Sequence, residues 1–488
     1  MSTTLVQSPS SILRLGYARA DITPPVGIYH RMWGAARHDR ASGVHRPLKA
    51  DLLLLEPFDA SGERLVRLQL DLVLLNNEHT EELISGIVDI AAVPPDRILV
   101  THSHSHSAGF FLPNRIPLPG GELIEPYLAS LKAAVEDLAR EALASLDTAS
   151  ITYCYGRCDL AANRDYRDSE RELYATGCNP DEVADDLVVT ARVCAGPAAD
   201  GEPRLSIVHY ACHPTTLAWD NSLLSPDFVG AMREVVETAT EVPCVYFQRP
   251  CGDLGPRDGF VGDTDVADRN GRQLGYAALS ALSSLGPPGH DFAYQGPVVS
   301  GATIGTWAWT SFDNRRRDEA SRWRGDTFTV DLPYRSLPDP DTLNSDLQRY
   351  SQEQARADAD GDTARARDLG ARAERCRRWL ARLAELPEGD QFPYRFSVYQ
   401  FGDALWITCS AEPYSLLARE LCRRFPDMTI LVSPIAGDAQ LAYLLPEEKY
   451  GIGLYQEEPS CLGPGCLESL IEALSERIEE VTGQPRIA

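Results

Sequence analysis

The sequence predicts an α/β protein in which mixed β-sheets are layered with helices. Short apolar runs bounded by Gly, Pro and Asp indicate strands, and they alternate with longer stretches in which leucine and alanine recur at helical spacing. The first clear alternation, between residues 65 and 107, has the order strand, helix, strand, which favours helices packed on a sheet. With 488 residues, 43% of them hydrophobic, the chain has enough apolar material for one large domain or two.

The N-terminal part predicts strands followed by a helix. The runs Ala50–Leu55 and Leu65–Leu75 flank a turn and predict a central strand pair, and a helix follows at about 81–92. Asp71 interrupts the second run, where a carboxylate either faces a site or caps a hydrogen-bonded corner. The long loop between Gly27 and Leu48 has no periodicity, and such a loop is either functional or a packed surface crossing.

The most informative stretch is 98–107, where three apolar residues precede a strict alternation of His with small hydroxyl residues. Side chains repeat every second position along a strand, so we expect His102, His104 and His106 to share one face at the end of a buried strand. The chain holds only ten histidines, and neutral imidazole is the commonest protein ligand for zinc. The stretch therefore indicates a metal site, with a hydrogen-bonded polar strand end or an exposed His tract as the alternative.

The middle of the chain continues the pattern. A helix opens at Glu125, because the proline that follows is well tolerated in a first turn. Further strands are predicted at Ser150–Tyr155, Asp186–Val193, Leu205–Tyr210 and Val245–Phe247. His213 follows the third of these strands, at a junction fixed by Pro214, which suits a ligand and equally suits an ordinary core histidine.

The segment at about 340–386 differs in composition and predicts a hairpin of two charged helices around a break at 357–362. Its many arginines indicate a solvated face rather than a binding patch. Beyond it, the predicted elements are strands at Ser397–Phe401, Leu405–Cys409 and Thr429–Val432 and a terminal helix from Cys466. Glu412 lies where the second of these strands gives way to a helix, which is a common place for a functional side chain.

Charge and composition restrict the partners. A formal net charge of −25 argues against nucleic acid or an anionic membrane surface, because both would be repelled. No run approaches the roughly twenty apolar residues of a membrane span, and residues 1–11 lack a signal-peptide pattern, so we expect a cytoplasmic protein without membrane insertion. Twelve cysteines without a CxxC pair favour reduced thiols, with a secreted disulfide protein as the alternative. The oligomeric state stays open.

Six motifs occur in the same order as in the catalytic domain of the neutral (alkaline, non-lysosomal) ceramidases, which the chain resembles from about Gly16 to its C-terminus. The motifs are Gly16-Tyr17-Ala18-Arg19-Ala20-Asp21-Ile22-Thr23-Pro24-Pro25, Ser103-His104-Ser105-His106-Ser107, Cys212-His213-Pro214-Thr215, Gly252-Asp253, Ala411-Glu412-Pro413-Tyr414 and Ala442-Tyr443-Leu444-Leu445-Pro446. No motif is decisive alone, whereas the ordered set is fairly specific. The resemblance implies one large catalytic domain over residues 1–488, with a helical hairpin inserted at about 340–386.

The resemblance also implies site residues. On the positions that match the family's zinc ligands, this chain has His104, His213, Glu412 and Tyr443. His106 and Tyr455 match groups that act beside the metal or on the transition state, and Arg164, in an Asn-Arg pair like that of the family, matches a substrate-binding residue. His102 stands where the family usually has a small residue.

The implied function is zinc-dependent hydrolysis of the amide C–N bond of an N-acylated small molecule. Zinc lowers the pKa of bound water to about 7, so that a metal-bound hydroxide can attack the carbonyl. Tyr455 or His106 would stabilise the oxyanion, and His106 would supply the leaving amine with a proton. The chain lacks the family's C-terminal immunoglobulin-like domain and secretion signal and has Gly109 in place of a usual Pro, so we expect a water-soluble substrate rather than ceramide.

Other classes fit the residues less well. A metallo-β-lactamase-like hydrolase needs His-x-His-x-Asp-His, and the register from His102 puts His106 and Ser107 at the last two positions. An amidohydrolase barrel would use the His-x-His strand, but the alternation of strands and helices is irregular. An esterase or deacetylase on the same zinc site is an alternative, as is a non-catalytic metal-binding module. The module is less favoured because structural zinc sites usually contain cysteine, which this set lacks.

Overall fold

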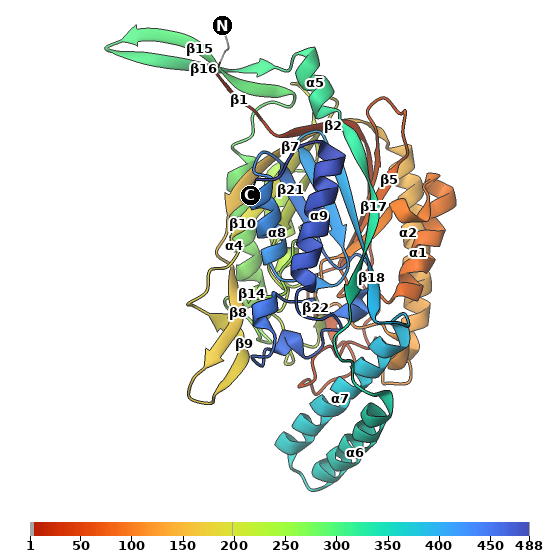
Figure 1. Cartoon of the computed structure of the whole chain (residues 1–488). Coiled ribbons are helices and arrows are strands. Elements are labelled where there is room, and N and C mark those ends of the chain that lie inside the picture. The colour runs from red at the N-terminus through yellow and green to blue at the C-terminus, as the bar shows by residue number, and fades with distance from the viewer. Residues whose placement is uncertain (1–3, 198, 488) are drawn as a thin grey trace.

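Two β-sheets face each other across an apolar core, and helices cover their outer faces (Figure 1). The computed structural model describes residues 4–197 and 199–487. This arrangement confirms the predicted α/β class with mixed sheets layered with helices. It arises because strand side chains alternate between two faces, so each sheet has one apolar face for the other sheet and one for its helices.

The larger sheet has eight strands and mixes parallel and antiparallel pairs. In spatial order they are β13 (Cys244–Gln248), β11 (Pro203–Tyr210), β10 (Leu187–Ala195), β7 (Asp147–Arg157), β2 (Ser10–Asp21), β4 (Lys49–Glu56), β5 (Leu65–Leu70) and β6 (Ile98–His102). β4 and β5 form the expected antiparallel pair, and β6 lies parallel to β5 with Leu70 opposite His102. The parallel arrangement follows from the helix that connects these two strands.

The smaller sheet lies against the inner face of the larger one. Its strands are, in spatial order, β17 (Trp323–Pro333), β18 (Gln391–Phe401), β19 (Ala404–Cys409) and β21 (Thr429–Ser433). The core between the sheets includes Leu53 of β4, Phe247 of β13 and Trp406 of β19, all at most 2% exposed. The candidate site lies where the segments after β6 and β11 of the larger sheet meet the segment after β19 of the smaller one.

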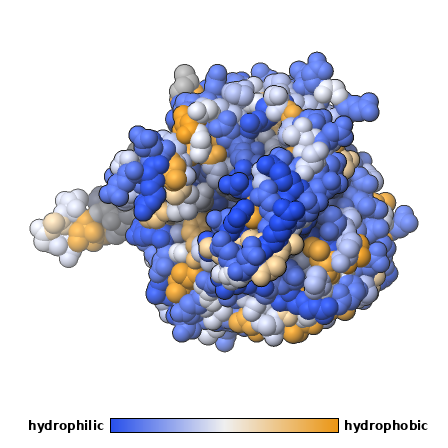
Figure 2. All heavy atoms as spheres, turned by 90° about the horizontal axis from the view of Figure 1, so that it is seen from below, coloured by the Kyte–Doolittle hydropathy of each residue, from blue (hydrophilic) through white to orange (hydrophobic). Residues whose placement is uncertain are grey.

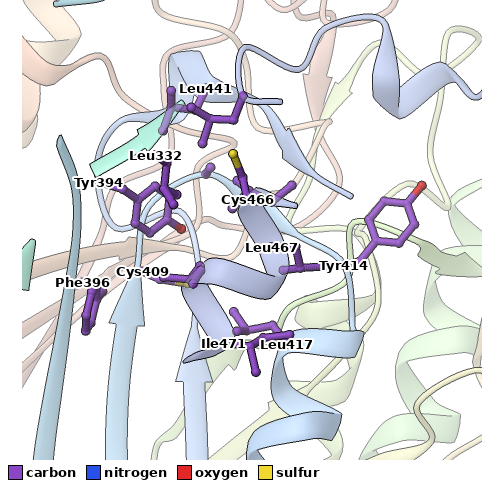
Figure 3. Packing of buried hydrophobic residues seen from close by; sticks show 14 of the residues in the cluster. Leu332, Tyr394, Phe396, Cys409, Tyr414, Leu417, Leu441, Cys466, Leu467 and Ile471 are labelled. Carbon is purple, nitrogen blue, oxygen red and sulfur yellow. The ribbon is translucent and has the colours of Figure 1, made fainter. Parts of the chain in front are cut away.

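Helices cover the outer faces of both sheets. On the larger sheet these are α1 (Asn77–Ala91), α2 (Ile124–Ala144), α3 (Phe228–Thr240) and α4 (Thr264–Leu282), and on the smaller sheet α8 (Leu416–Arg424) and α9 (Cys466–Thr482). Figure 3 shows Leu417 of α8 against Ile471 of α9, in the apolar cluster where these helices pack on the smaller sheet. In residues 4–197 and 199–487, no helix is long and apolar enough to cross a membrane.

Two helices form a hairpin at one end of the molecule, α6 (Pro340–Ala359) and α7 (Thr363–Glu385) (Figure 1). Helix α7 is tied to the body by Glu374, whose two carboxylate oxygens accept hydrogen bonds of 2.8 and 2.6 Å from Arg115. Its Trp379 donates a hydrogen bond of 3.0 Å to Glu458. That this hairpin is an insertion into a single domain stays a prediction.

At the opposite end an arm projects from the body (Figure 1). It is a sheet of β1 (Leu5–Val6), β15 (His290–Ser300) and β16 (Ala302–Ser311), and helix α5 (Asn314–Ala320) follows it. The remaining short strands are β3 (Gly43–Val44), β8 (Ala161–Asp168), β9 (Leu173–Asn179), β12 (Leu223–Leu224), β14 (Leu254–Pro256), β20 (Glu412–Pro413) and β22 (Tyr443–Leu444). Hydrophilic residues cover most of the surface seen from the end where the α6–α7 hairpin projects (Figure 2).

Candidate metal centre

The histidine stretch leaves the sheet earlier than its alternation predicts. Strand β6 ends at His102, and His104 has a left-handed backbone with φ of 66°. The expectation that His102, His104 and His106 share one strand face is therefore wrong. The turn forms because the main chain finds other partners: the amide of His104 donates to Leu72 at 3.0 Å and that of His106 to Pro214 at 3.3 Å.

The turn brings two of the three histidines together with a third from another strand. Nitrogen atoms of His104, His106 and His213 all lie within 4.8 Å of one another, so that they could hold a metal ion. The Nε2 atoms of His104 and His106 are 3.3 Å apart. His213 arrives from the loop after β11, as its place before Pro214 suggests. His102 lies outside this group, and its Nδ1 donates to the carbonyl of Ile435 at 3.1 Å.

Glu412, which follows β19 of the smaller sheet, lies next to two of these histidines. Its Oε2 atom lies 3.2 Å from Nε2 of His104 and 3.1 Å from Nε2 of His213. Its strand β20 pairs in parallel with β22, so that Glu412 lies opposite Tyr443. The residue before each of them, Ala411 and Ala442, has a positive φ, of 62° and 56°. These two bends turn both side chains out of their sheet and toward the histidines.

The hydrogen bonds of the His104 and His213 rings show which nitrogen of each ring carries the proton. Nδ1 of His104 donates to the carbonyl of Val73 at 2.6 Å, and Nδ1 of His213 donates to that of Cys251 at 3.0 Å. Carbonyl oxygens only accept, so each ring carries its proton on Nδ1, and each Nε2 presents a lone pair to the carboxylate of Glu412. When both rings are neutral, these facing acceptors need a positive partner, either a proton on Nε2 or a metal ion. Nitrogen and oxygen donors in this number suit a divalent metal such as zinc.

The surroundings keep these groups in the protonation states that bind a metal. Burial, followed by the charge of Arg164, lowers the pKa of His213 to about 4, so its ring is neutral at pH 7. Burial raises the pKa of Glu412, but His104 and His213 outweigh it when they carry a proton on Nε2, through their charge and hydrogen bonds, and hold that pKa well below the usual range. Burial and the neighbouring His104 likewise lower the pKa of His106. Neutral imidazoles and an ionised carboxylate are what metal coordination requires.

The other predicted site residues surround Tyr443. The ring of Tyr443 lies 6.2 Å from that of His213 and 6.1 Å from that of Tyr455, measured between centroids. The guanidinium carbon of Arg164 lies 5.4 Å from the Tyr443 centroid. Arg164 is buried, whereas Tyr455 is 46% exposed. The structure thus brings His104, His106, His213 and Glu412 together, with Tyr443 beside them and with Arg164 and Tyr455 around Tyr443.

Three aromatic residues that sequence reasoning did not select lie on the side of His106. The Trp33 ring is 5.3 Å from the His106 ring, and the rings of Trp219 and Phe260 lie 6.1 and 5.8 Å from that of Trp33. Trp33 belongs to the long aperiodic loop between Gly27 and Leu48. The length of this loop was the sequence feature that pointed to a functional role for its residues. Asp71 does not belong to the site, because it forms a buried ion pair with Arg233 at 2.9 Å.

Comparisons with known proteins agree with this architecture. No protein-family model matches the sequence, and no curated protein sequence matches it. The neutral ceramidase from Pseudomonas aeruginosa is similar in structure, with a TM-score of 0.64 and 15% identity over 98% of this chain and 75% of the other. A ceramidase complexed with C2 is similar with a TM-score of 0.61 and 16% identity, over 99% and 77% of the two chains. The chain therefore has the neutral ceramidase fold, as the sequence resemblance predicts.

Proposed function

We propose that this protein is a zinc-dependent amidohydrolase that cleaves the linear amide C–N bond of an N-acylated small molecule. The observation that carries the proposal is the contact of Glu412 with both His104 and His213 on a ceramidase fold. Two neutral imidazoles whose Nε2 lone pairs face one carboxylate need a cation between them, and a divalent metal is the cation that this donor set suits. Closed structural zinc sites usually contain cysteine, whereas this set contains none, which favours a catalytic role.

His104, His213, Glu412 and Tyr443 would hold the zinc. When bound there, zinc supplies a Lewis acid for the amide carbonyl and lowers the pKa of a water molecule to about 7. Nδ1 of His104 and Nδ1 of His213 each keep their proton on a backbone carbonyl, which fixes both rings and keeps each Nε2 free to bind. The metal-binding atoms are therefore pre-oriented by the protein.

Three further residues would act on the substrate, two of them directly and one through Tyr443. Nε2 of His106, next to His104, is placed to receive a proton and to pass it to the nitrogen of the leaving amine. The exposed phenol of Tyr455 beside Tyr443 is placed to donate a hydrogen bond to the carbonyl oxygen as negative charge develops there. Arg164 would act on the substrate through Tyr443, over whose ring it lies.

The substrate would be a small, water-soluble N-acyl compound. Ceramide is the substrate class that the names of the structural neighbours suggest, and it lies in a membrane. A net charge of −25 opposes approach to an anionic membrane surface. The ring of Trp33 beside His106, with Trp219 and Phe260 packed against Trp33, offers an apolar wall for an acyl group that diffuses in from water.

The test combines metal analysis with turnover. We expect the purified protein to contain about one zinc per chain, to lose hydrolysis of N-acyl amides with a chelator, and to regain it with added zinc. His213→Ala should lower kcat/KM by at least about 100-fold and lose the metal. His290→Ala is the matched control, because His290 lies on the arm and bonds Pro288 and Ser311 there.

Three results would contradict the proposal. A His213→Ala protein that keeps its metal and its activity would show that the proposed residues do not form the zinc site. Hydrolysis of esters without amides would replace the reaction by an esterase activity on the same residues. Tight metal binding without turnover of either class would favour the non-catalytic module.

A further inference from the structure

Arg67 is a buried cation that has no counter-ion in the part of the chain that the structure describes. It lies in the middle of β5, is 2% exposed, and points into the core between the two sheets. Its guanidinium carbon lies 4.8 Å from the centroid of Phe247 and 5.8 Å from that of Trp406. Within residues 4–197 and 199–487, its Nε and its second terminal nitrogen (NH2) have no hydrogen-bond partner.

The charge of Arg67 persists in this position. Burial lowers the pKa of Arg67 to about 9, so the guanidinium is still protonated at pH 7. Moving such a charge out of water is costly, and cation–π contact with the two facing aromatic rings offsets only part of this cost. The neighbouring cation Arg249 has a counter-ion of its own, Asp185 at 2.8 Å. Among the residues that the structure describes, no carboxylate pairs with Arg67 in the same way.

A second unpaired donor lies on the same side of the strand. Gln69 is two residues further along β5, so its side chain points into the same core about 7 Å away. Its Oε1 accepts a hydrogen bond of 2.6 Å from Thr101, and its Nε2 has no partner among the described residues. Two neighbouring side chains thus offer several N–H groups and one positive charge to the same space.

A single buried water does not satisfy these donors. His209, whose pKa the charge of Arg67 lowers, has an unpaired acceptor: its Nε2 donates to Val432 at 2.8 Å, which leaves the lone pair of Nδ1 without a partner among the described residues. Burial and then the charges of Arg249 and Arg67 lower the pKa of His209 to about 3, which shows how positive this part of the core is. A water could join Arg67 to His209, but the charge would stay uncompensated.

We propose that the core between the two sheets binds a small monovalent inorganic anion such as chloride, held by the guanidinium of Arg67 and the amide nitrogen of Gln69. One unit of negative charge matches one unpaired guanidinium, whereas a multivalent anion would leave an excess charge in a dry core. The anion would join β5 to β13 and β19, and its binding is independent of the metal and of the proposed reaction.

The test uses the whole protein and compares two sodium salts at equal ionic strength. Chloride is a small monovalent anion, whereas gluconate has the same charge on a much larger organic ion. Ligands that bind only the folded state raise its Tm, so between about 1 mM and about 500 mM chloride we expect a saturating rise of about 2 °C that gluconate does not give. In crystals grown with bromide, an anomalous peak should lie between Arg67 and Gln69.

Variants separate this site from general salt effects. Arg67→Met keeps most of the side-chain volume and should abolish the difference between chloride and gluconate. Arg419→Met, at an exposed position of α8, should keep it. Equal Tm values of the wild-type protein in both salts, together with no bromide peak, would overturn the proposal. Those two wild-type measurements decide the matter even where Arg67→Met fails to fold.

Discussion

Arg164 lies against Tyr443, with its guanidinium carbon 5.4 Å from the centre of the tyrosine ring. Its Nε and one terminal nitrogen donate hydrogen bonds of 3.2 and 2.7 Å to the carbonyl of Gly252. The guanidinium is thus held by the main chain on one side and supports the tyrosine on the other. These contacts favour a positioning role for Arg164, exerted through Tyr443, over direct contact with substrate.

Replacing Arg164 should therefore disturb metal binding as well as turnover. We expect Arg164→Met to lower kcat/KM by about 10- to 100-fold and to weaken zinc affinity, because Tyr443 loses its support. Competition with a coloured chelator and steady-state kinetics measure the two effects. Arg167→Met, on the exposed part of the same strand, is the control. A rise in KM alone, with unchanged zinc affinity, would instead indicate direct substrate binding.

His106 is expected to move protons rather than to hold the metal. The variant His106→Gln should keep about one zinc per chain, while kcat falls by about 100- to 10,000-fold, the range for loss of a general acid or base. Atomic absorption and an amide-hydrolysis assay give the two numbers. Because His106 also belongs to the group of three neighbouring histidines, loss of zinc in this variant would make it a ligand.

The ion pair between Glu374 and Arg115 should anchor the α6–α7 hairpin. Arg115 is fully buried, so Glu374→Gln leaves a buried charge with a weaker partner and should cost about 3 to 5 kcal/mol of unfolding free energy. Urea unfolding measures this cost. Glu353→Gln removes an exposed pair with Arg365 at 4.0 Å and should change stability by less than about 1 kcal/mol. Equal effects of the two variants would show that the buried pair contributes no more than the exposed one.

Acid should destabilise the fold partly through His209. Its pKa is 6.5 in an unfolded chain and about 3 in the folded protein, because burial and then Arg249 and Arg67 disfavour its charge. Below pH 6.5 the unfolded chain binds a proton that the folded protein does not bind, so stability falls as the pH drops from 6.5 toward 3. Each pH unit inside this window costs about 1.4 kcal/mol.

The variant His209→Gln removes this contribution, and its amide can still donate to Val432. Urea unfolding at about pH 7 and about pH 5 should show a smaller loss of stability in the variant than in the wild-type protein, by about 1 to 2 kcal/mol. His290→Gln on the arm serves as the control. A wild-type loss that His209→Gln leaves unchanged would assign the acid sensitivity to other groups.

Elements with a strong local pattern could be predicted from the sequence. The pair β4 and β5 and the helices α2 and α9 have clear apolar periodicity and appear where expected. Strand β17 was missed because its partner β18 follows only after the helical hairpin, so that no local signal links them. The arm of β15 and β16 was missed as well, since most of its residues are exposed on both faces and show no burial pattern.

The candidate site shows a different limit. The residue types and the order of the motifs predicted which side chains lie together, but they did not predict the backbone conformation that brings them together. The alternation in residues 98–107 fits a long strand and equally fits a strand followed by a turn. The turn depends on hydrogen bonds to the main-chain carbonyls of Leu72 and Pro214, which are distant in sequence. The side-chain pattern carries no information about such bonds. Trp33 could not be selected because its contact with His106 depends on the path of a whole loop.

The donors of the metal centre come from both sheets. His104 and His106 follow β6 at one edge of the larger sheet, His213 follows β11 near its other edge, and Glu412 follows β19 of the smaller sheet. No fragment containing one sheet alone can assemble the full set. Zinc uptake during refolding would then report the moment at which the two halves of the molecule have docked, separately from the earlier formation of secondary structure.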